Sequence, residues 1–201
     1  MKKNFRSSLK AGVALICCFA GGKLSAQNLL TNGSFETGNL SSWASSGAVT
    51  VTNEGQTSQA GSQSAVFNTA NAAPNGVLSQ SFATTIGTPY QLIFFYSLFN
   101  SVGNTQKLDV LVTGSSALVN TIVTSPAGTS PNTFGQFTFP FTANSTSTTL
   151  QFTDDSSNVT TNRDGILDNV SVTQTPEPAS GALLLAGGIG MLAARRRRRV
   201  A

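Results

Sequence analysis

Residues 136–142 read Gln-Phe-Thr-Phe-Pro-Phe-Thr, with a phenylalanine at every second position. Successive side chains of a β-strand point to opposite faces, so this alternation predicts a strand with one apolar face and one wet face. The same period recurs upstream, where Leu108 and Val110 alternate with Lys107 and Asp109. No helical period persists between these segments, so the pattern predicts β-structure for the central part of the chain.

The segment Tyr90–Phe99 (YQLIFFYSLF) is apolar at both alternating positions. We therefore expect it at the centre of a sheet, covered on both faces, with Phe94 and Phe95 in the core. Turn-forming pairs such as Asn75-Gly76 separate the strand candidates. About nine short strands predict an all-β fold, a β-sandwich and in particular a jelly roll. The predicted strands are Gly47–Thr52, Ser64–Asn68, Val77–Ala83, Tyr90–Phe99, Lys107–Thr113, Ala117–Thr124, Gln136–Thr142, Thr148–Thr153 and Gly165–Val172.

The composition of residues 27–175 excludes several kinds of catalytic, metal and binding site. The chain has no histidine, and its only cysteines are Cys17 and Cys18. The central segment therefore has no thiol nucleophile, disulfide, zinc-thiolate site or Ser-His-Asp triad. It holds two basic residues against seven acidic ones, which excludes a phosphate-binding basic patch and hence nucleic-acid binding.

The N-terminal 26 residues have the parts of a secretory signal peptide. Lys2, Lys3 and Arg6 lie in a basic region, an apolar stretch follows over residues 11–20, and Ala26 offers a small residue before a cut. We predict residues 1–26 to be a signal peptide and the protein to be exported. A cut nearer residue 20 and a buried helix of a cytosolic domain are the alternatives.

The C-terminal residues 176–201 combine three elements. Prolines flank Glu177, an apolar segment covers residues 179–194, and five arginines follow. As a helix the apolar segment reaches roughly 24 Å, short of the ~30 Å hydrocarbon core but within reach of snorkelling and thinning. We predict one short transmembrane helix at 179–194 with its arginine end in the cytoplasm. A nucleic-acid-binding arginine tail is the alternative, although it leaves the apolar run unexplained.

This order of elements resembles the PEP-CTERM sorting signal of bacterial surface and exopolysaccharide-associated proteins. The resemblance implies recognition by an exosortase, a membrane-embedded cysteine protease or transpeptidase, and transient membrane anchoring before cleavage or exchange of the tail. It assigns a sorting role to the motif and to the basic cluster, namely Pro176, Glu177, Pro178, Arg195, Arg196, Arg197, Arg198 and Arg199.

A second resemblance covers nearly all of residues 27–175. The opening segment 28–38 (NLLTNGSFETG), followed by Trp43, and the closing segment 165–172 (GILDNVSV) are similar to the two ends of the galactose-binding-like jelly roll. That fold houses many carbohydrate-binding modules. The resemblance implies the fold and a buried Trp43, and it is weakly specific for any activity.

Glu36 and Asp168 belong to these two ends. The jelly-roll group often has a structural Ca²⁺ where its first and last strands meet, so the resemblance implies that both carboxylates are calcium ligands. Calcium prefers carboxylate and carbonyl oxygens. The alternative is that Glu36 caps a turn and Asp168 accepts hydrogen bonds from neighbouring amides.

Catalytic and sugar-stacking residues are harder to assign. Two carboxylates can hydrolyse a glycosidic bond, so a glycan-active hydrolase could use two of four acids. Sugar rings stack on exposed aromatic rings. Tyr96 and Phe99 lie on opposite faces of their strand, so at most one of them lines a groove. The four acids are Asp154, Asp155, Asp164 and Glu54.

The residues together predict a non-enzymatic exported surface or extracellular-matrix protein that is sorted by an exosortase and binds bacterial exopolysaccharide. The segments are residues 1–26 (signal peptide), 27–175 (jelly-roll ectodomain) and 176–201 (sorting signal). The glycan hydrolase and a structural coat protein without a specific ligand are the alternatives.

Overall fold

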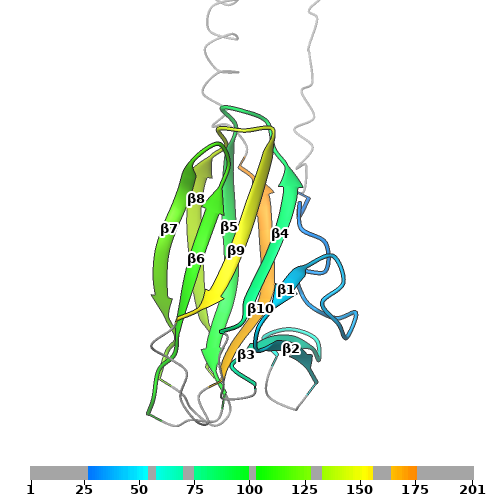
Figure 1. Ribbon diagram of the computed structural model, residues 1–201, viewed down its shortest axis with the longest axis vertical. Helices are drawn as coiled ribbons and strands as arrows, with labels where there is room; N and C mark the ends of the chain where they lie inside the picture. The colour runs from blue at the N-terminus through cyan, green and yellow to red at the C-terminus, as the bar shows by residue number, and fades with distance from the viewer. Residues whose placement is uncertain are drawn as a thin grey trace, which may run out of the picture.

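The structure, a computed structural model, describes residues 27–53, 58–69, 75–99, 103–127, 133–155 and 164–175. Ten antiparallel strands in these ranges form two five-stranded sheets packed face to face (Figure 1). One sheet has the order β1-β4-β9-β6-β7 and the other β2-β3-β10-β5-β8. The strands are β1 (Ala44–Ser46), β2 (Val49–Thr52), β3 (Ser64–Phe67), β4 (Val77–Ala83), β5 (Pro89–Leu98), β6 (Lys107–Thr113), β7 (Ala117–Thr124), β8 (Gly135–Thr142), β9 (Ser147–Asp154) and β10 (Gly165–Gln174).

The all-β two-sheet sandwich is therefore confirmed. Each of the nine predicted strands is present, with its ends within two residues of the predicted ones. The tenth, β1, was missed because Ala44, Ser45 and Ser46 are all exposed and show no apolar alternation.

The expectation that the Tyr90–Phe99 segment is covered on both faces is wrong. Its strand β5 does lie inside a sheet, between β10 and β8. Tyr90, Leu92 and Phe94 on one face are buried, whereas Ile93 and Phe95 on the other face are only half-buried. A two-layer sandwich covers one face of each sheet, so the second apolar face meets solvent or loops. Phe95 is thus not a core residue.

The core fills the space between the sheets. The ring of Phe94 stacks on Phe137 with centroids 5.4 Å apart and meets Phe152 of the opposite sheet edge-on at 5.1 Å. Trp43 is 6% exposed, as predicted. Its indole N–H donates to the carbonyl of Asn32 at 3.0 Å, so the polar atom of this large ring is satisfied.

The first described residues lie along the last strand. The backbone N–H of Leu29 donates to the carbonyl of Val172 at 2.8 Å, and the N–H of Val170 donates to the carbonyl of Gly33 at 2.8 Å. The Asn28 side chain bonds to β10 as well, at the carbonyl of Val170 and the N–H of Val172. The two ends of the described domain therefore lie side by side.

Several sequence predictions concern residues outside these ranges. The signal peptide 1–26 and the tail 176–201, with its apolar segment 179–194, lie outside the described residues, as does Glu54. Within the described part of the chain there is no helix long and apolar enough to cross a bilayer.

Gly33 allows the opening segment to approach β10 closely. A Cβ at this position would meet the backbone carbonyl of Val170. We predict that Gly33→Ala lowers the free energy of unfolding by about 1–3 kcal/mol, because one of two backbone segments must move. Urea denaturation measures the change. Ser34→Ala is the control, and equal stability of the two variants would contradict the prediction.

Candidate functional site

The two predicted calcium ligands, Asp168 and Glu36, accept hydrogen bonds from the same loop. Asp168 Oδ2 accepts hydrogen bonds from the backbone N–H of Gln59 at 2.7 Å and of Ala60 at 3.1 Å. Glu36 Oε1 accepts from the N–H of Ser62 at 2.9 Å and of Gln63 at 2.8 Å. The structure thus brings together residues that are distant in sequence, around residues 58–63.

This arrangement shifts the pKa values of the two carboxyl groups in opposite directions. Hydrogen bonds from the Gln63 and Ser62 amides hold the pKa of Glu36 below its ordinary value. Burial raises the pKa of Asp168, which has no exposed surface, against the opposing effect of the Ala60 amide and its neighbours. The carboxylate of Glu36 lies close enough to contribute to that rise.

All four carboxylate oxygens of the pair accept at least one hydrogen bond. Besides the amides of the loop, the Ser62 hydroxyl donates to Glu36 Oε2 and the Asn169 N–H to Asp168 Oδ1. Gly61, with a φ of 76°, leaves room for the Glu36 carboxylate. This arrangement corresponds to the metal-free alternative, in which Glu36 caps a turn and Asp168 accepts hydrogen bonds from neighbouring amides. Their hard oxygens also suit Ca²⁺, which would share them with these donors.

The three described acids of the hydrolase alternative lie near one another at one end of the sandwich. Asp155 and Asp164 both contribute to raising the pKa of Asp154, although burial is the largest cause. Asp154 is 1% exposed and points into the sandwich in phase with Phe152. A glycan on the surface cannot reach its carboxyl group, and Glu54 lies outside the described residues.

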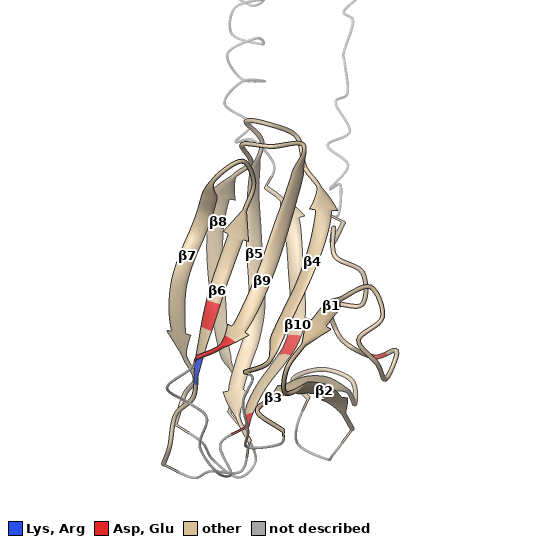
Figure 2. Ribbon diagram, viewed as in Figure 1, with Lys and Arg blue, Asp and Glu red and all other residues tan. Residues whose placement is uncertain are grey.

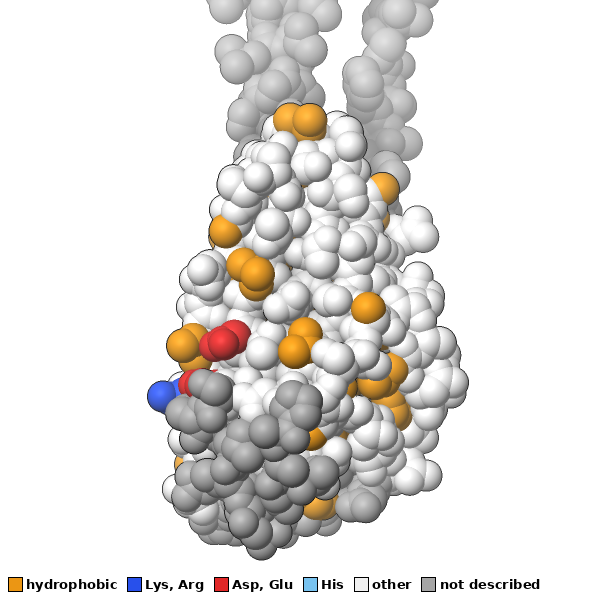
Figure 3. Space-filling view, in the orientation of Figure 1, with side chains coloured by type: hydrophobic (Ala, Val, Ile, Leu, Met, Phe, Trp, Pro, Cys, Tyr) orange, Lys and Arg blue, Asp and Glu red, His pale blue; other side chains and the backbone are white. Residues whose placement is uncertain are grey.

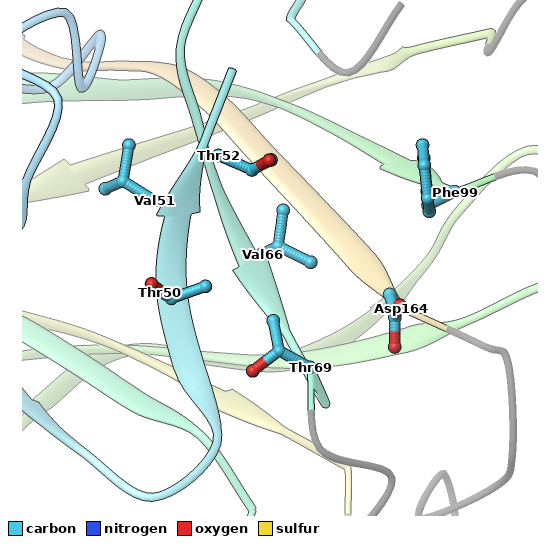
Figure 4. A pocket seen from close by; sticks show the side chains of 7 residues that line it. All are labelled: Thr50, Val51, Thr52, Val66, Thr69, Phe99 and Asp164. Atoms are coloured by element: carbon cyan, nitrogen blue, oxygen red, sulfur yellow. The ribbon is translucent and has the colours of Figure 1, made fainter. Parts of the chain in front are cut away.

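Asp164 instead lines a surface pocket of about 250 Å³. The pocket lies on the outer face of the β2-β3-β10-β5-β8 sheet, where Thr50 and Thr52 of β2 alternate with inward-facing positions. Figure 4 shows Val66 of β3 in the middle, β2 on one side, and Phe99 and Asp164 on the other. The lining residues are Thr50, Val51, Thr52, Val66, Thr69, Phe99 and Asp164.

The pocket chemistry suits a small polyhydroxylated ligand. Hydroxyl groups both donate and accept, and a carboxylate accepts from two hydroxyls at once. The half-buried Phe99 ring supplies an apolar surface for C–H groups. Of the two aromatic residues considered from the sequence, Phe99, just after β5, lines this pocket. Tyr96 is fully buried, and its hydroxyl donates to the Lys107 carbonyl.

Sequence reasoning missed the threonines of the pocket. Thr50 and Thr52 lie in the predicted strand Gly47–Thr52, and nothing in that segment marks them as ligand-binding residues. No sequence signal connects that face with Asp164, because the pairing β2-β3-β10 that joins them depends on the tertiary fold.

The outer face of the other sheet is polar and weakly charged. One row across it runs from Ser79 through Gln151 and Leu111 to Asn120. Figure 2 shows few charged residues over these strands, and Figure 3 shows hydrophobic side chains scattered over the same face. This face offers many neutral hydrogen-bonding groups and no described aromatic platform.

The described residues contain no group of three or more acidic, histidine or cysteine side chains that could hold a metal ion. The sorting residues, Pro176, Glu177, Pro178 and Arg195 to Arg199, lie outside the described ranges.

The architecture matches known structures over most of the chain. A TmCBM61 module in complex with β-1,4-galactotriose aligns with a TM-score of 0.57 at 18% identity, covering 75% of this chain and 100% of that one. A CBM22 xylan-binding domain from Paenibacillus barcinonensis aligns with a TM-score of 0.50 at 17% identity, covering 76% and 97%.

Other matches include an adhesin domain. The K1 cleaved adhesin domain of Lys-gingipain from Porphyromonas gingivalis aligns with a TM-score of 0.53 at 15% identity, covering 71% of this chain and 96% of that one. No protein-family model and no curated protein matches the sequence. At these identities the likeness concerns the fold, and the function rests on the site itself.

Proposed function

We propose that this chain is a glycan-binding module and that the pocket between β2 and Phe99 receives a sugar residue. The observation behind the proposal is the set of lining groups, three threonine hydroxyls and one carboxylate beside one aromatic ring. Binding sites for sugars combine such directed polar groups with an apolar ring surface. A volume of about 250 Å³ accommodates one sugar ring rather than a long chain segment.

Binding fits the site better than hydrolysis. Glycoside hydrolysis needs two carboxyl groups on either side of the scissile bond. Among the described lining residues Asp164 is the single carboxylate, and Asp154 faces the interior. We therefore assign no catalytic residue and propose a non-enzymatic role.

The biological setting that we propose follows from the two ends of the sequence. A signal peptide at 1–26 exports the chain, and the Pro-Glu-Pro motif, apolar segment and arginines of 176–201 present it to an exosortase-type enzyme. The domain then resides at the outer surface or in the extracellular matrix, where bacterial exopolysaccharide is its glycan ligand.

The glycan proposal predicts a selective effect of one aromatic residue. We expect the purified chain to bind saturably to one or more polysaccharides of an exopolysaccharide panel, and Phe99→Ala to weaken that binding about tenfold. Isothermal titration or affinity electrophoresis measures the change. Thr50→Val, which removes one hydroxyl at nearly constant volume, should weaken it as well.

Phe95→Ala is the matched control, because Phe95 is a half-buried aromatic residue of β5, the strand that ends just before Phe99, and it does not line the pocket. Equal losses in the Phe95 and Phe99 variants would place the glycan elsewhere. If the parent chain binds no glycan of the panel, the proposal fails and the structural coat protein becomes the better account.

We also propose one structural Ca²⁺ at Glu36 and Asp168. If the ion binds, EDTA should lower the melting temperature of the chain and added calcium should restore it, since a ligand of the folded state stabilises that state. Asp168→Asn should abolish the response to EDTA. A melting temperature unaffected by EDTA would leave the carboxylates as anchors of the loop without a metal.

The sorting proposal predicts processing that depends on the motif. Co-expressed with an exosortase in a host that lacks one, the chain should lose its C-terminal segment and change its mass. Replacing Glu177 by Ala should prevent this, whereas Glu54→Ala should not. Unchanged mass of the parent chain would contradict an exosortase substrate.

A further inference from the structure

Two of the buried oxygen atoms that have no hydrogen-bond partner belong to side chains that are bonded to each other at one end of the sandwich. They are Oδ2 of Asp154 and Oε1 of Gln106, and both residues are at least 99% buried. Their groups are already joined, because Gln106 Nε2 donates to Asp154 Oδ1 at 3.2 Å. Each group thus uses one polar atom in the shared hydrogen bond and leaves the oxygen beside it unused.

A buried acceptor without a hydrogen-bond partner costs stability, and each of these two hydrogen-bonded groups has one. An ionised carboxylate and an amide oxygen both only accept, so they cannot satisfy one another. One proton on Asp154 Oδ2 removes the conflict, because a carboxylic acid donates from one oxygen and accepts at the other. An amide offers the complementary N–H and C=O.

We propose that Asp154 retains a proton in the folded protein and forms a buried acid–amide pair with Gln106 that closes this end of the sandwich. The pair joins segments that are far apart in sequence. Asp154 ends β9, and its backbone N–H donates to the carbonyl of Gly76 at 2.9 Å. Gln106 precedes β6 and is bonded through its own backbone to Ser125, which follows β7.

The electrostatic surroundings favour the protonated acid. Burial, together with the charges of Asp155, Asp164 and Asp109, raises the pKa of Asp154 to about 6 against the opposing Gln106 hydrogen bond. Tyr96 also faces this region, and its own pKa is raised well above its ordinary value by burial and by Asp154. Lys107 of β6 is the single basic residue of the described ranges and lies next to Gln106 in sequence.

The sign of the pH dependence follows from the raised pKa. The ordinary value for this carboxyl is 3.8, and the folded value is about 6. The folded state therefore holds more protons than the unfolded state between these values. The stability that the pair contributes is complete below about pH 4 and is lost as the pH rises through about 6.

The decisive comparison is with Asp154→Asn, because an asparagine donates and accepts as the protonated acid does at every pH. We expect equal melting temperatures of the full-length parent and variant, both in detergent, near pH 4, and a variant that melts about 5–10 °C higher near pH 8. Asp155→Asn is the control, with the same charge change on the adjacent side chain, and it should retain the parent's dependence on pH.

A direct titration keeps the proposal testable if the variant does not fold. In the ¹³C NMR spectrum of the parent chain, one aspartate carboxyl should titrate near pH 6. A difference in melting temperature that does not change with pH, or titration of every aspartate near its ordinary value, would overturn the proposal. Stabilisation of the parent at neutral pH by Ca²⁺ that is absent from Asp154→Asn would assign a cation rather than a proton to this position.

Discussion

The contact between the opening segment and the last strand determines the rest of the domain. Leu29 donates a backbone hydrogen bond to β10 and Gly33 accepts one from it, and the missing side chain of Gly33 permits the close approach. Once these two segments meet, Glu36 and Asp168 lie on either side of one loop. Both carboxylates then hold backbone amides that have no strand partner, which is how a long irregular segment is tolerated beside a sheet.

Sequence periodicity was sufficient to predict the strands, because most of them have one face in the core and one face toward solvent. The alternation in β6 and β8 places their ends to within a residue. The prediction was wrong where apolar residues occupied both faces. For Ile93 and Phe95 the pattern indicated a third layer, but a sandwich of two sheets provides none. The short strand β1 was not predicted, because an exposed edge strand has no hydrophobic alternation to detect.

The candidate site was harder to predict from the sequence than the strands, because the tertiary fold brings its residues together. Glu36 and Asp168 were found through the family resemblance of their flanking motifs, and the structure brings them together. The pocket joins β2 to the segment before β10, and nothing in either segment specifies the other. Burial likewise distinguishes the adjacent Asp154 and Asp155, since the sequence alone does not show that the Asp154 carboxyl group lies in the interior.

The side-by-side ends of the domain have a geometric consequence. Strand β10 has ten residues, a length of roughly 30 Å. Thr175 leaves one end of it, close to Pro89, while the pocket residue Asp164 precedes its other end. An attachment through either terminus would therefore hold the domain by one pole and present the pocket at the opposite one. The length of the sandwich would then separate the point of attachment from the pocket.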